Sequence, residues 1–257
     1  MDLGLRNKVA LVTGGSRGIG RSIAHALADE GCHVAITARG QRDLDATAEE
    51  LRSKDVQVLP IALDLAVADA PAAAVEQTVK GLGTIQVLVN NVGGSQGDAD
   101  VAGSTDEQWI FTLDVNLMAA VRASRAAIPH MRSAKWGRIV HITSIYGRES
   151  GGPPAYNAAK SAMNSLATSM SRELAADGIL VNAVAPGSIL FPGGGWERRQ
   201  RDDPEGMVDF MHREFPLGRF GAPEEVAALV AFLASERASL ITGTCINIDG
   251  GQSKSLI

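Results

Sequence analysis

The chain has 257 residues, of which 45% are hydrophobic and 21% are charged, and its formal net charge is −5. This apolar content can bury a core and excludes a disordered chain. The acidic balance gives no overall basic footprint for a nucleic acid, and no apolar run approaches the roughly 20 residues that cross a bilayer. The short apolar run 9–12 predicts a buried strand rather than part of a secretory signal.

The two cysteines, Cys32 and Cys245, lie far apart in the sequence. They lack the spacing of a metal site or a redox pair. Both lie in apolar, strand-like segments, where a free cysteine packs as a small hydrophobe. The sequence therefore predicts no metal and a reducing, cytoplasmic environment.

Apolar runs and helical patterns alternate along the whole chain. Strands are expected at 8–13, 33–38, 57–61, 85–90, 138–143, 180–185 and 245–248. Helices are expected near 18–30, 41–53, 68–82, 105–132, 154–177 and 223–235. Because most strand candidates are apolar on both faces, they indicate a buried parallel sheet. The alternation predicts an α/β fold, a doubly wound parallel sheet of about seven strands with helices on both faces. No linker interrupts it, so residues 1–257 are expected to form a single domain.

A glycine-rich turn, TGGSRGIG at 13–20, follows the first expected strand directly. Gly14, Gly18 and Gly20 permit a tight turn and a close approach of the backbone to a phosphate. The N–H groups of the following helix point toward the same anion. This position between a strand and a helix predicts a dinucleotide-binding turn.

Tyr156 and Lys160 lie four residues apart in YNAAK, so they share one face of an expected helix. Ser144 follows the fifth expected strand, at the edge of the sheet where α/β proteins bind ligands. Taken singly, Ser144 could instead cap local backbone, and Asn116 could be a structural helix residue.

The motifs together resemble those of the short-chain dehydrogenase/reductase family, and the resemblance covers essentially the whole chain. The matching segments are 13–20, Asp64-Leu65, NNVG at 90–93, Asn116, Ser144, YNAAK at 156–160, Pro186-Gly187 and IDGG at 248–251. They occur in the order and at the spacing of the family. The resemblance implies a Rossmann-type fold and an oxidoreductase that transfers a hydride between a nicotinamide cofactor and a carbonyl or secondary alcohol.

The resemblance also implies the roles of the site residues. Tyr156 would be the general acid or base, and Lys160 would lower the pKa of Tyr156 and hold the nicotinamide ribose. Ser144 would donate a hydrogen bond to the carbonyl oxygen, and Asn116 would hold a water of a proton relay. Residues expected to bind the cofactor are Gly14, Ser16, Arg17, Gly18, Ile19, Gly20, Arg39, Asp64, Leu65, Asn91, Gly93, Tyr156, Lys160, Pro186, Gly187 and Ile189.

Two arginines predict NADP(H) rather than NAD(H) as the cofactor. The second expected strand ends at Ala38, where an NAD-dependent member typically carries an aspartate, and Arg39 follows it directly. Arg17 lies within the glycine turn, and no carboxylate is expected to repel a 2′-phosphate there.

The chain departs from the family pattern after Pro186-Gly187. Phe191 stands where many members have a threonine that contacts the nicotinamide amide, and Ser188 is a candidate replacement. The segment 188–220 interrupts the alternation with three consecutive glycines and a dense run of charges. It is expected to be a substrate lid, with a solvated surface loop as the alternative.

The substrate remains open at this point. A 3-oxoacyl thioester on an acidic carrier protein would need a basic patch beside the cleft. Candidates for this patch are Arg122, Arg125, Arg132 and Lys135, whereas Asp177 would repel an acidic partner. Sugars, steroids and other small ketones fit equally well. The alternative function is a catalytically silent NADP(H)-binding sensor. No nucleic-acid or membrane partner is expected. The resemblance implies that the two long helices, expected at 105–132 and 154–177, pair across a two-fold axis in a homotetramer or homodimer.

Overall fold

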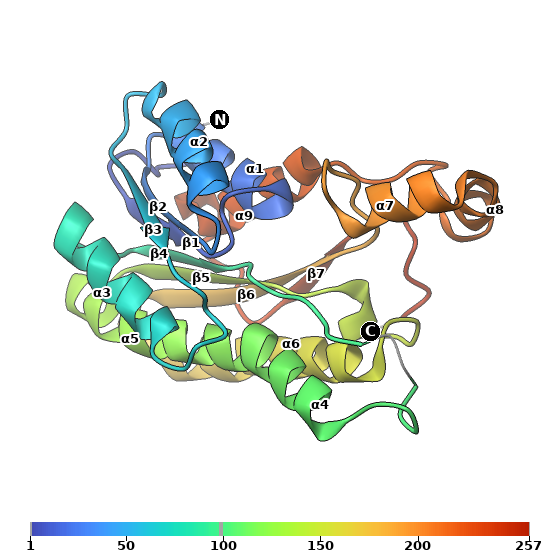
Figure 1. The fold of residues 1–257 in the computed structure, drawn as a ribbon. Coiled ribbons are helices and arrows are strands. Elements are labelled where there is room, and N and C mark those ends of the chain that lie inside the picture. Colours follow the sequence, from blue (N-terminus) through green and yellow to red (C-terminus); the bar gives the residue numbers. More distant parts are fainter. Residues whose placement is uncertain (1, 98–99, 257) are drawn as a thin grey trace.

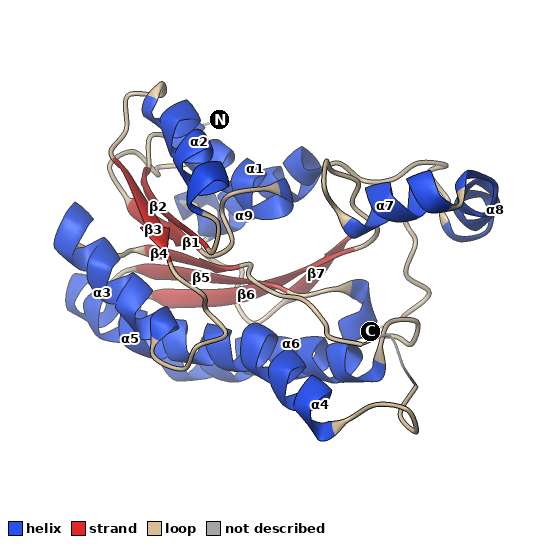
Figure 2. Cartoon of the chain, viewed as in Figure 1, coloured by secondary structure: helices blue, strands red, loops and turns tan. Residues whose placement is uncertain are grey.

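A parallel sheet forms the centre of the computed structural model, which describes residues 2–97 and 100–256 (Figures 1 and 2). Its strand order is β3-β2-β1-β4-β5-β6-β7, and all neighbours are parallel. The strands are β1 (Val9–Val12), β2 (His33–Ala38), β3 (Val58–Ala62), β4 (Val87–Asn90), β5 (Gly137–Ile142), β6 (Ile179–Pro186) and β7 (Cys245–Ile248). The predicted α/β, doubly wound sheet of seven strands is confirmed.

Helices cover both faces of this sheet (Figure 1). One face carries α1 (Gly18–Asp29), α2 (Gln41–Arg52) and α9 (Pro223–Ala234), and the other carries α3 (Ala70–Leu82), α5 (Ala119–Ala134) and α6 (Pro154–Leu174). Successive strand side chains enter opposite cores: Val12 packs under the first group of helices and Leu11 under the second. Because both faces are covered, the strands are apolar on both sides.

The helix predicted over 105–132 is interrupted, which corrects the sequence-based expectation. It consists of α4 (Asp106–Leu113), a π-helical turn over Asp114–Met118, and α5. The Asn116 side-chain amide donates to the Thr112 carbonyl at 2.8 Å. That carbonyl would accept from the backbone N–H of residue 116 in a regular α-helix, so the side chain competes with the helical ladder at this point. A 3₁₀ turn over Ala175–Asp177 likewise ends α6 earlier than predicted.

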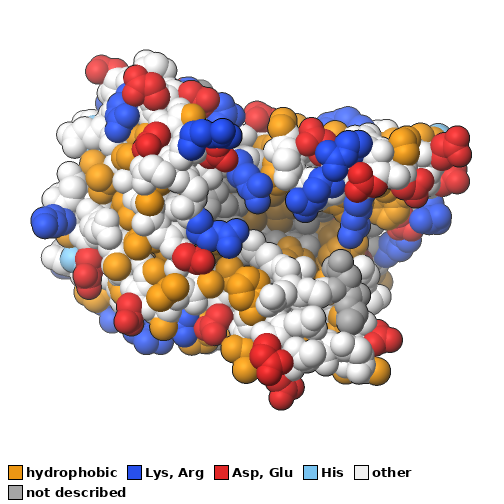
Figure 3. All heavy atoms as spheres, in the orientation of Figure 1, with side chains coloured by type: hydrophobic (Ala, Val, Ile, Leu, Met, Phe, Trp, Pro, Cys, Tyr) orange, Lys and Arg blue, Asp and Glu red, His pale blue; other side chains and the backbone are white. Residues whose placement is uncertain are grey.

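The segment 188–220 folds into two helices, α7 (Gly195–Asp202) and α8 (Pro204–Glu214), which project beyond the sheet (Figure 1). Trp196 on α7 stacks on Phe210 of α8 with 5.2 Å between ring centroids, and in the segment after α8 Phe215 meets Phe220 at 4.8 Å. The segment is therefore not an irregular loop. A hollow lies between it and the rest of the molecule (Figure 3).

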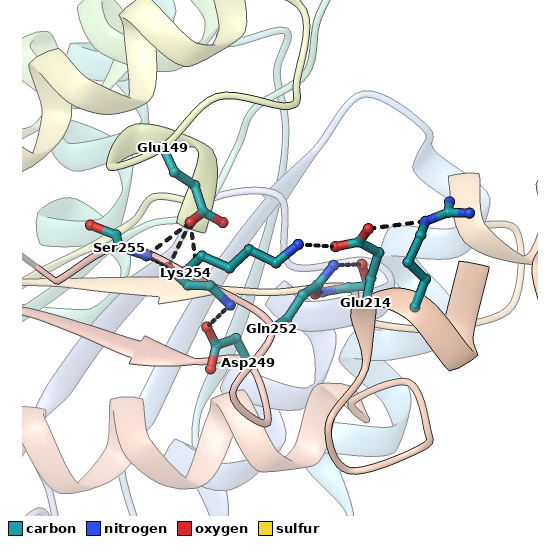
Figure 4. A network of polar contacts seen from close by, with 9 residues as sticks. Glu149, Glu214, Asp249, Gln252, Lys254 and Ser255 are labelled. Carbon is teal, nitrogen blue, oxygen red and sulfur yellow. Dashed lines mark hydrogen bonds and ion pairs between the residues drawn. The ribbon is translucent and has the colours of Figure 1, made fainter. Parts of the chain in front are cut away.

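The C-terminal segment fixes the end of α8 to the turn after β5 (Figure 4). The Lys254 ammonium pairs with the Glu214 carboxylate at 3.0 Å. The Glu149 carboxylate accepts from the backbone N–H of Lys254 at 2.8 Å and of Ser255 at 3.1 Å, and from the Ser253 hydroxyl at 3.0 Å. α8 is thus held at its last residue, whereas α7 lies over the carboxyl edge of the sheet.

Candidate active site

A cleft of about 870 Å³ opens at the carboxyl edge of the sheet. From β1 the chain adds β2 and β3 on one side of the sheet, and then returns to add β4 to β7 on the other side. The direction therefore switches between β1 and β4, and ligands bind at the carboxyl ends of the strands at such a switch point. Predicted site residues that line the cleft are Gly14, Ser16, Arg17, Ile19, Gly20, Arg39, Asp64, Leu65, Asn91, Gly93, Ser144, Tyr156, Lys160, Pro186, Gly187 and Ile189. Gly18 and Asn116 are not among the lining residues. Six strand ends thus bring together residues that are distant in the sequence.

The glycine turn leaves room that any side chain would fill. Gly14 has a φ of +67°, and a Cβ on Gly20 would lie 2.2 Å from the Gly14 carbonyl oxygen. α1 begins directly after the turn, and the Arg17 side chain makes no capping hydrogen bond to its first N–H groups. Uncapped N–H groups at a helix start bind anions. This cradle fits the pyrophosphate of a dinucleotide.

Gly18 has another neighbour. A Cβ at this position would lie 2.6 Å from the ring of Phe191, so Gly18 allows the segment after β6 to pack on the turn. Phe191 therefore lines the cleft as an apolar wall. Ser188 does not replace the missing threonine: it is buried and its hydroxyl accepts from the Gln252 side-chain amide at 3.0 Å. That suggested replacement is wrong, because Ser188 is buried and is not among the residues that line the cleft.

Ser144, Tyr156 and Lys160 meet at the cleft floor. The Lys160 ammonium lies 5.4 Å from the Tyr156 ring centroid and donates to the Ile142 carbonyl at 2.9 Å. The Ser144 hydroxyl is hydrogen-bonded to the Tyr156 phenol and also accepts from the backbone N–H of Tyr146 at 3.2 Å. The start of α6 and the end of β5 thus place a proton donor, a hydroxyl and an ammonium in one group.

Burial controls the ionisation of this group. It raises the pKa of Tyr156 to about 12, outweighing the lowering by the Ser144 hydrogen bond, and lowers the pKa of Lys160 to about 7. The expectation that Lys160 lowers the Tyr156 pKa is therefore not met in this structure. An ammonium with so low a pKa is only partly charged near neutral pH, and desolvation disfavours the charged forms of both groups.

Asn116 lies behind the cleft instead of in its wall. Its side chain is fully buried, donates to the Gly94 carbonyl at 2.6 Å and accepts from the Gly94 N–H at 3.3 Å. A Cβ on Gly93 would lie 2.6 Å from the Asn116 amide oxygen and 3.2 Å from the Lys160 ammonium. Both side chains therefore border Gly93, and the water relay stays a prediction.

Arg17 and Arg39 line the far end of the cleft, and both are exposed. Neither has an ion pair within residues 2–97 and 100–256. Asp43, in the first turn of α2, lines the same region and pairs with Arg42 at 3.4 Å. The expectation that no carboxylate lies near this position is wrong. Asp43 follows Arg39 by four residues and stands at the start of the helix expected at 41–53. This position could have predicted a carboxylate near Arg39 from the sequence.

The predicted basic patch is dispersed. Arg132 pairs with Asp177 at 2.7 Å where α5 and α6 end, and Lys135 lies next to them, close to the starts of β5 and β6. Because these helices run back across the sheet, their C-terminal ends lie at the edge opposite the cleft of the same chain. Arg122 pairs with Asp114 at 3.0 Å. Asp177 therefore cannot oppose a partner at this cleft, and these cations do not border it.

Sequence reasoning missed several residues that line or support the cleft. Thr13 directly follows β1, and its hydroxyl accepts from the backbone N–H groups of Asn91 at 2.8 Å and Val92 at 3.0 Å. This contact joins the glycine turn to the end of β4. Trp196 and Arg198 reach the cleft from α7. Both residues lie within the segment 188–220 that is expected to be the lid, but nothing in the local sequence shows that α7 turns their side chains toward the cleft.

The two shifted pKa values predict how stability depends on pH without cofactor. Between pH about 7 and 10.5, the unfolded chain binds a proton on Lys160 that the folded chain does not, so the free energy of unfolding rises with pH. Between pH 10 and about 12, the folded chain keeps the Tyr156 proton that the unfolded chain loses, so stability falls. Urea unfolding of the wild type and Lys160→Met across pH 7 to 10 measures the first slope. An unchanged slope in the variant contradicts the assignment to Lys160.

The fold and the site define the class of protein: an oxidoreductase of the doubly wound α/β type. The profile of a family described as enoyl-(acyl carrier protein) reductase matches residues 14–253. The 3-oxoacyl-[acyl-carrier-protein] reductase FabG of Staphylococcus epidermidis is 38% identical over 247 residues, which cover 95% of this chain and 98% of that protein. The short-chain reductase protein NovJ of Streptomyces niveus is 36% identical over 96% of this chain and 94% of its own length.

Solved structures agree with these sequence relatives. The L-sorbose reductase of Gluconobacter frateurii, complexed with NADPH and L-sorbose, has a TM-score of 0.93 at 35% identity, with full coverage of both chains. A 3-oxoacyl (acyl-carrier-protein) reductase of Agrobacterium tumefaciens with NADP bound has a TM-score of 0.91 at 34% identity, over 97% of this chain and 96% of that one. The chain belongs to the short-chain dehydrogenase/reductase family.

Proposed function

We propose that this oxidoreductase uses NADP(H) and reduces a carbonyl compound to a secondary alcohol. The observation that carries the proposal is that Ser144, Tyr156 and Lys160 line the same cleft as the glycine turn and Arg17. A dinucleotide bound along this cleft supplies the hydride. The site residues supply the proton and the hydrogen bonds.

Tyr156 is the proposed proton donor to the carbonyl oxygen. A pKa raised to about 12 keeps its phenol protonated near neutral pH, as a donor in reduction requires. The Ser144 hydroxyl, already hydrogen-bonded to Tyr156, is the proposed second donor to that oxygen. Lys160 holds the nicotinamide ribose and returns a proton to Tyr156, and Asn116 is the proposed holder of the relay water behind Lys160.

The preference for NADP(H) has two supports. Arg17 and Arg39 are unpaired cations at one end of the cleft, which suits a 2′-phosphate. The solved relatives named above were bound to NADPH or NADP. Asp43 opposes this preference, and its pairing with Arg42 weakens its repulsion. The proposed cofactor-binding residues are the predicted site residues given above as lining the cleft, except Ser144, together with Gly18.

The substrate is proposed only as a class: a 3-oxoacyl thioester, a sugar, a steroid or another small ketone. Relatives of this chain are named for both a 3-oxoacyl thioester and L-sorbose. The alternative of a silent sensor has no observation in its favour, because the tyrosine, the lysine and the serine are all present and in contact with the cleft.

The same proposal covers the organisation of the protein. Residues 1–257 are proposed to form one domain in which 188–220 acts as the substrate lid. The proposed assembly is a homotetramer or homodimer, for which Ile110 on α4, 60% exposed, offers apolar surface. Within the described residues no helix is both long and apolar enough to cross a membrane. A cytoplasmic location stays a prediction from the two free cysteines.

Purified protein assayed with NADPH and NADH against a panel of carbonyl compounds tests the proposal. We expect oxidation of NADPH with at least one ketone, and a higher kcat/KM with NADPH than with NADH. Tight calorimetric binding of NADPH with no turnover on the whole panel would favour the sensor. Binding of neither dinucleotide would overturn the proposal.

A further inference from the structure

We propose that Arg198, on α7, binds a phosphate group of the dinucleotide, so that the cofactor itself holds the lid segment 188–220 over the cleft. The inference rests on the proposed function, because it needs a dinucleotide in this cleft. It adds a residue from the lid to the two arginines of the sheet edge.

The first observation is position. Arg198 lines the same cleft as Arg17, Arg39 and the glycine turn, although it lies about 180 residues later in the chain. The start of the lid is close to Arg17, since a Cβ on Gly193 would lie 4.0 Å from an Arg17 guanidinium nitrogen. The space-filling view shows Lys and Arg side chains on both sides of the hollow (Figure 3). The lid and the sheet edge therefore present cations to the same space.

The second observation is the lack of a partner. Arg201 on α7 pairs with Asp202 at 3.3 Å, and Arg199 lies over the Trp196 ring with 4.9 Å to its centroid. Glu197 accepts from the Gly193 N–H at 2.7 Å. Arg198 has no ion pair or ring contact in the part of the chain that the structure describes. The neighbouring contacts on α7 are internal to the lid, whereas the Arg198 guanidinium is available to a ligand.

Electrostatics identifies the ligand as an anion. Three unpaired guanidinium groups around one cleft repel one another, and an anion between them removes that repulsion. Guanidinium groups bind phosphate through two parallel hydrogen bonds, stronger than bonds between neutral groups. A dinucleotide offers the pyrophosphate and, in NADPH, the 2′-phosphate, and both have this chemistry.

Binding through Arg198 would stabilise the lid. The last residue of α8 is already tied to the C-terminal segment through Lys254 and Glu214 (Figure 4). A phosphate held by Arg198 would tie α7 to the glycine turn at the other end. Because coupling between sites is reciprocal, a lid stabilised by the dinucleotide also raises the affinity for the dinucleotide.

The test compares Arg198→Gln with Arg201→Gln, a matched control on the same helix whose side chain does not line the cleft. Kd values for NADPH and NADH are measured by calorimetry, and tryptic cleavage after Arg199 is followed with and without saturating NADPH. We expect Arg198→Gln to weaken NADPH by about tenfold or more, while Arg201→Gln stays at the wild-type value. We also expect NADPH to slow the cleavage in the wild type and in Arg201→Gln, but less in Arg198→Gln.

The two dinucleotides identify the phosphate. Weakening of NADPH and NADH alike in Arg198→Gln assigns the contact to the pyrophosphate, and weakening of NADPH alone assigns it to the 2′-phosphate. An Arg198→Gln variant that matches Arg201→Gln in Kd and in protection overturns the inference while the proposed function stands. A wild type that binds neither dinucleotide overturns the proposed function first.

Discussion

Replacing Tyr156 by phenylalanine is expected to lower kcat by a factor on the order of 10² or more. The variant keeps the ring next to Lys160 and loses the phenol that donates the proton. The Kd of NADPH is therefore expected to stay at the wild-type value. Steady-state kinetics with an accepted ketone and calorimetry with NADPH measure the two quantities on the same protein.

Tyr146→Phe is the matched control, because Tyr146 is the other tyrosine of the chain and lies two residues after Ser144. It faces a second pocket, lined also by Phe210 and Lys254, and is absent from the lining of the catalytic cleft. We expect this control to keep most of the wild-type kcat. Near-normal turnover in Tyr156→Phe, or an equal loss in both variants, contradicts the assignment of the proton donor.

Arg39→Ala is expected to weaken NADPH by about ten- to a hundredfold and to leave NADH almost unchanged. The factor corresponds to one charge-assisted hydrogen bond of about 1.5–3 kcal/mol, which the 2′-phosphate makes and NADH lacks. Arg52→Ala is the matched control, since Arg52 ends the same helix α2, pairs with Glu49 and does not line the cleft. The values of kcat/KM for both cofactors measure the effect. A wild type that prefers NADH, or an equal loss for both cofactors, contradicts this reading of the loop.

Ala38→Asp is expected to shift the preference further toward NADH. Ala38 ends β2 and lines the cleft beside Arg39. A carboxylate at this position repels the 2′-phosphate and offers the ribose hydroxyls an acceptor. Asp43→Asn supplies the opposite change, removing a carboxylate from the same wall, and we expect it to tighten NADPH binding. A loss of NADPH affinity in Asp43→Asn would show that Asp43 positions the neighbouring arginine instead of opposing the phosphate.

The sequence predicted the strands because their composition is set by burial on both faces. Each observed strand lies within two residues of its predicted range, and the sheet has the expected seven. The glycine turn was predictable for a related reason: a Cβ on Gly20 would collide with the Gly14 carbonyl, and only glycine avoids the collision. The Tyr156–Lys160 pair follows from helical spacing alone, since residues four apart share a face.

The π-helical turn at Asn116 and the pairing of Arg132 with Asp177 were not predictable in this way. The first depends on a side chain that binds Thr112 and Gly94 together, and the second on two helix ends that meet only in the folded chain. The raised pKa of Tyr156 and the lowered pKa of Lys160 also depend on burial, which no local pattern shows.

The sequence by itself determined the fold class, the glycine turn and the Tyr156–Lys160 pair, because each depends on local residue types and spacings. Ser144 was added to the pair through its place after the fifth expected strand and the family resemblance. Only the tertiary structure decided which charges reach the cleft. It turned Arg198 and Asp43 into the cleft wall, bound Ser188 to Gln252, and placed Arg132 and Lys135 at the opposite edge. The physical reason is that charge and hydroxyl contacts are set by the directions in which separate helices cross the sheet, and these directions arise from long-range packing.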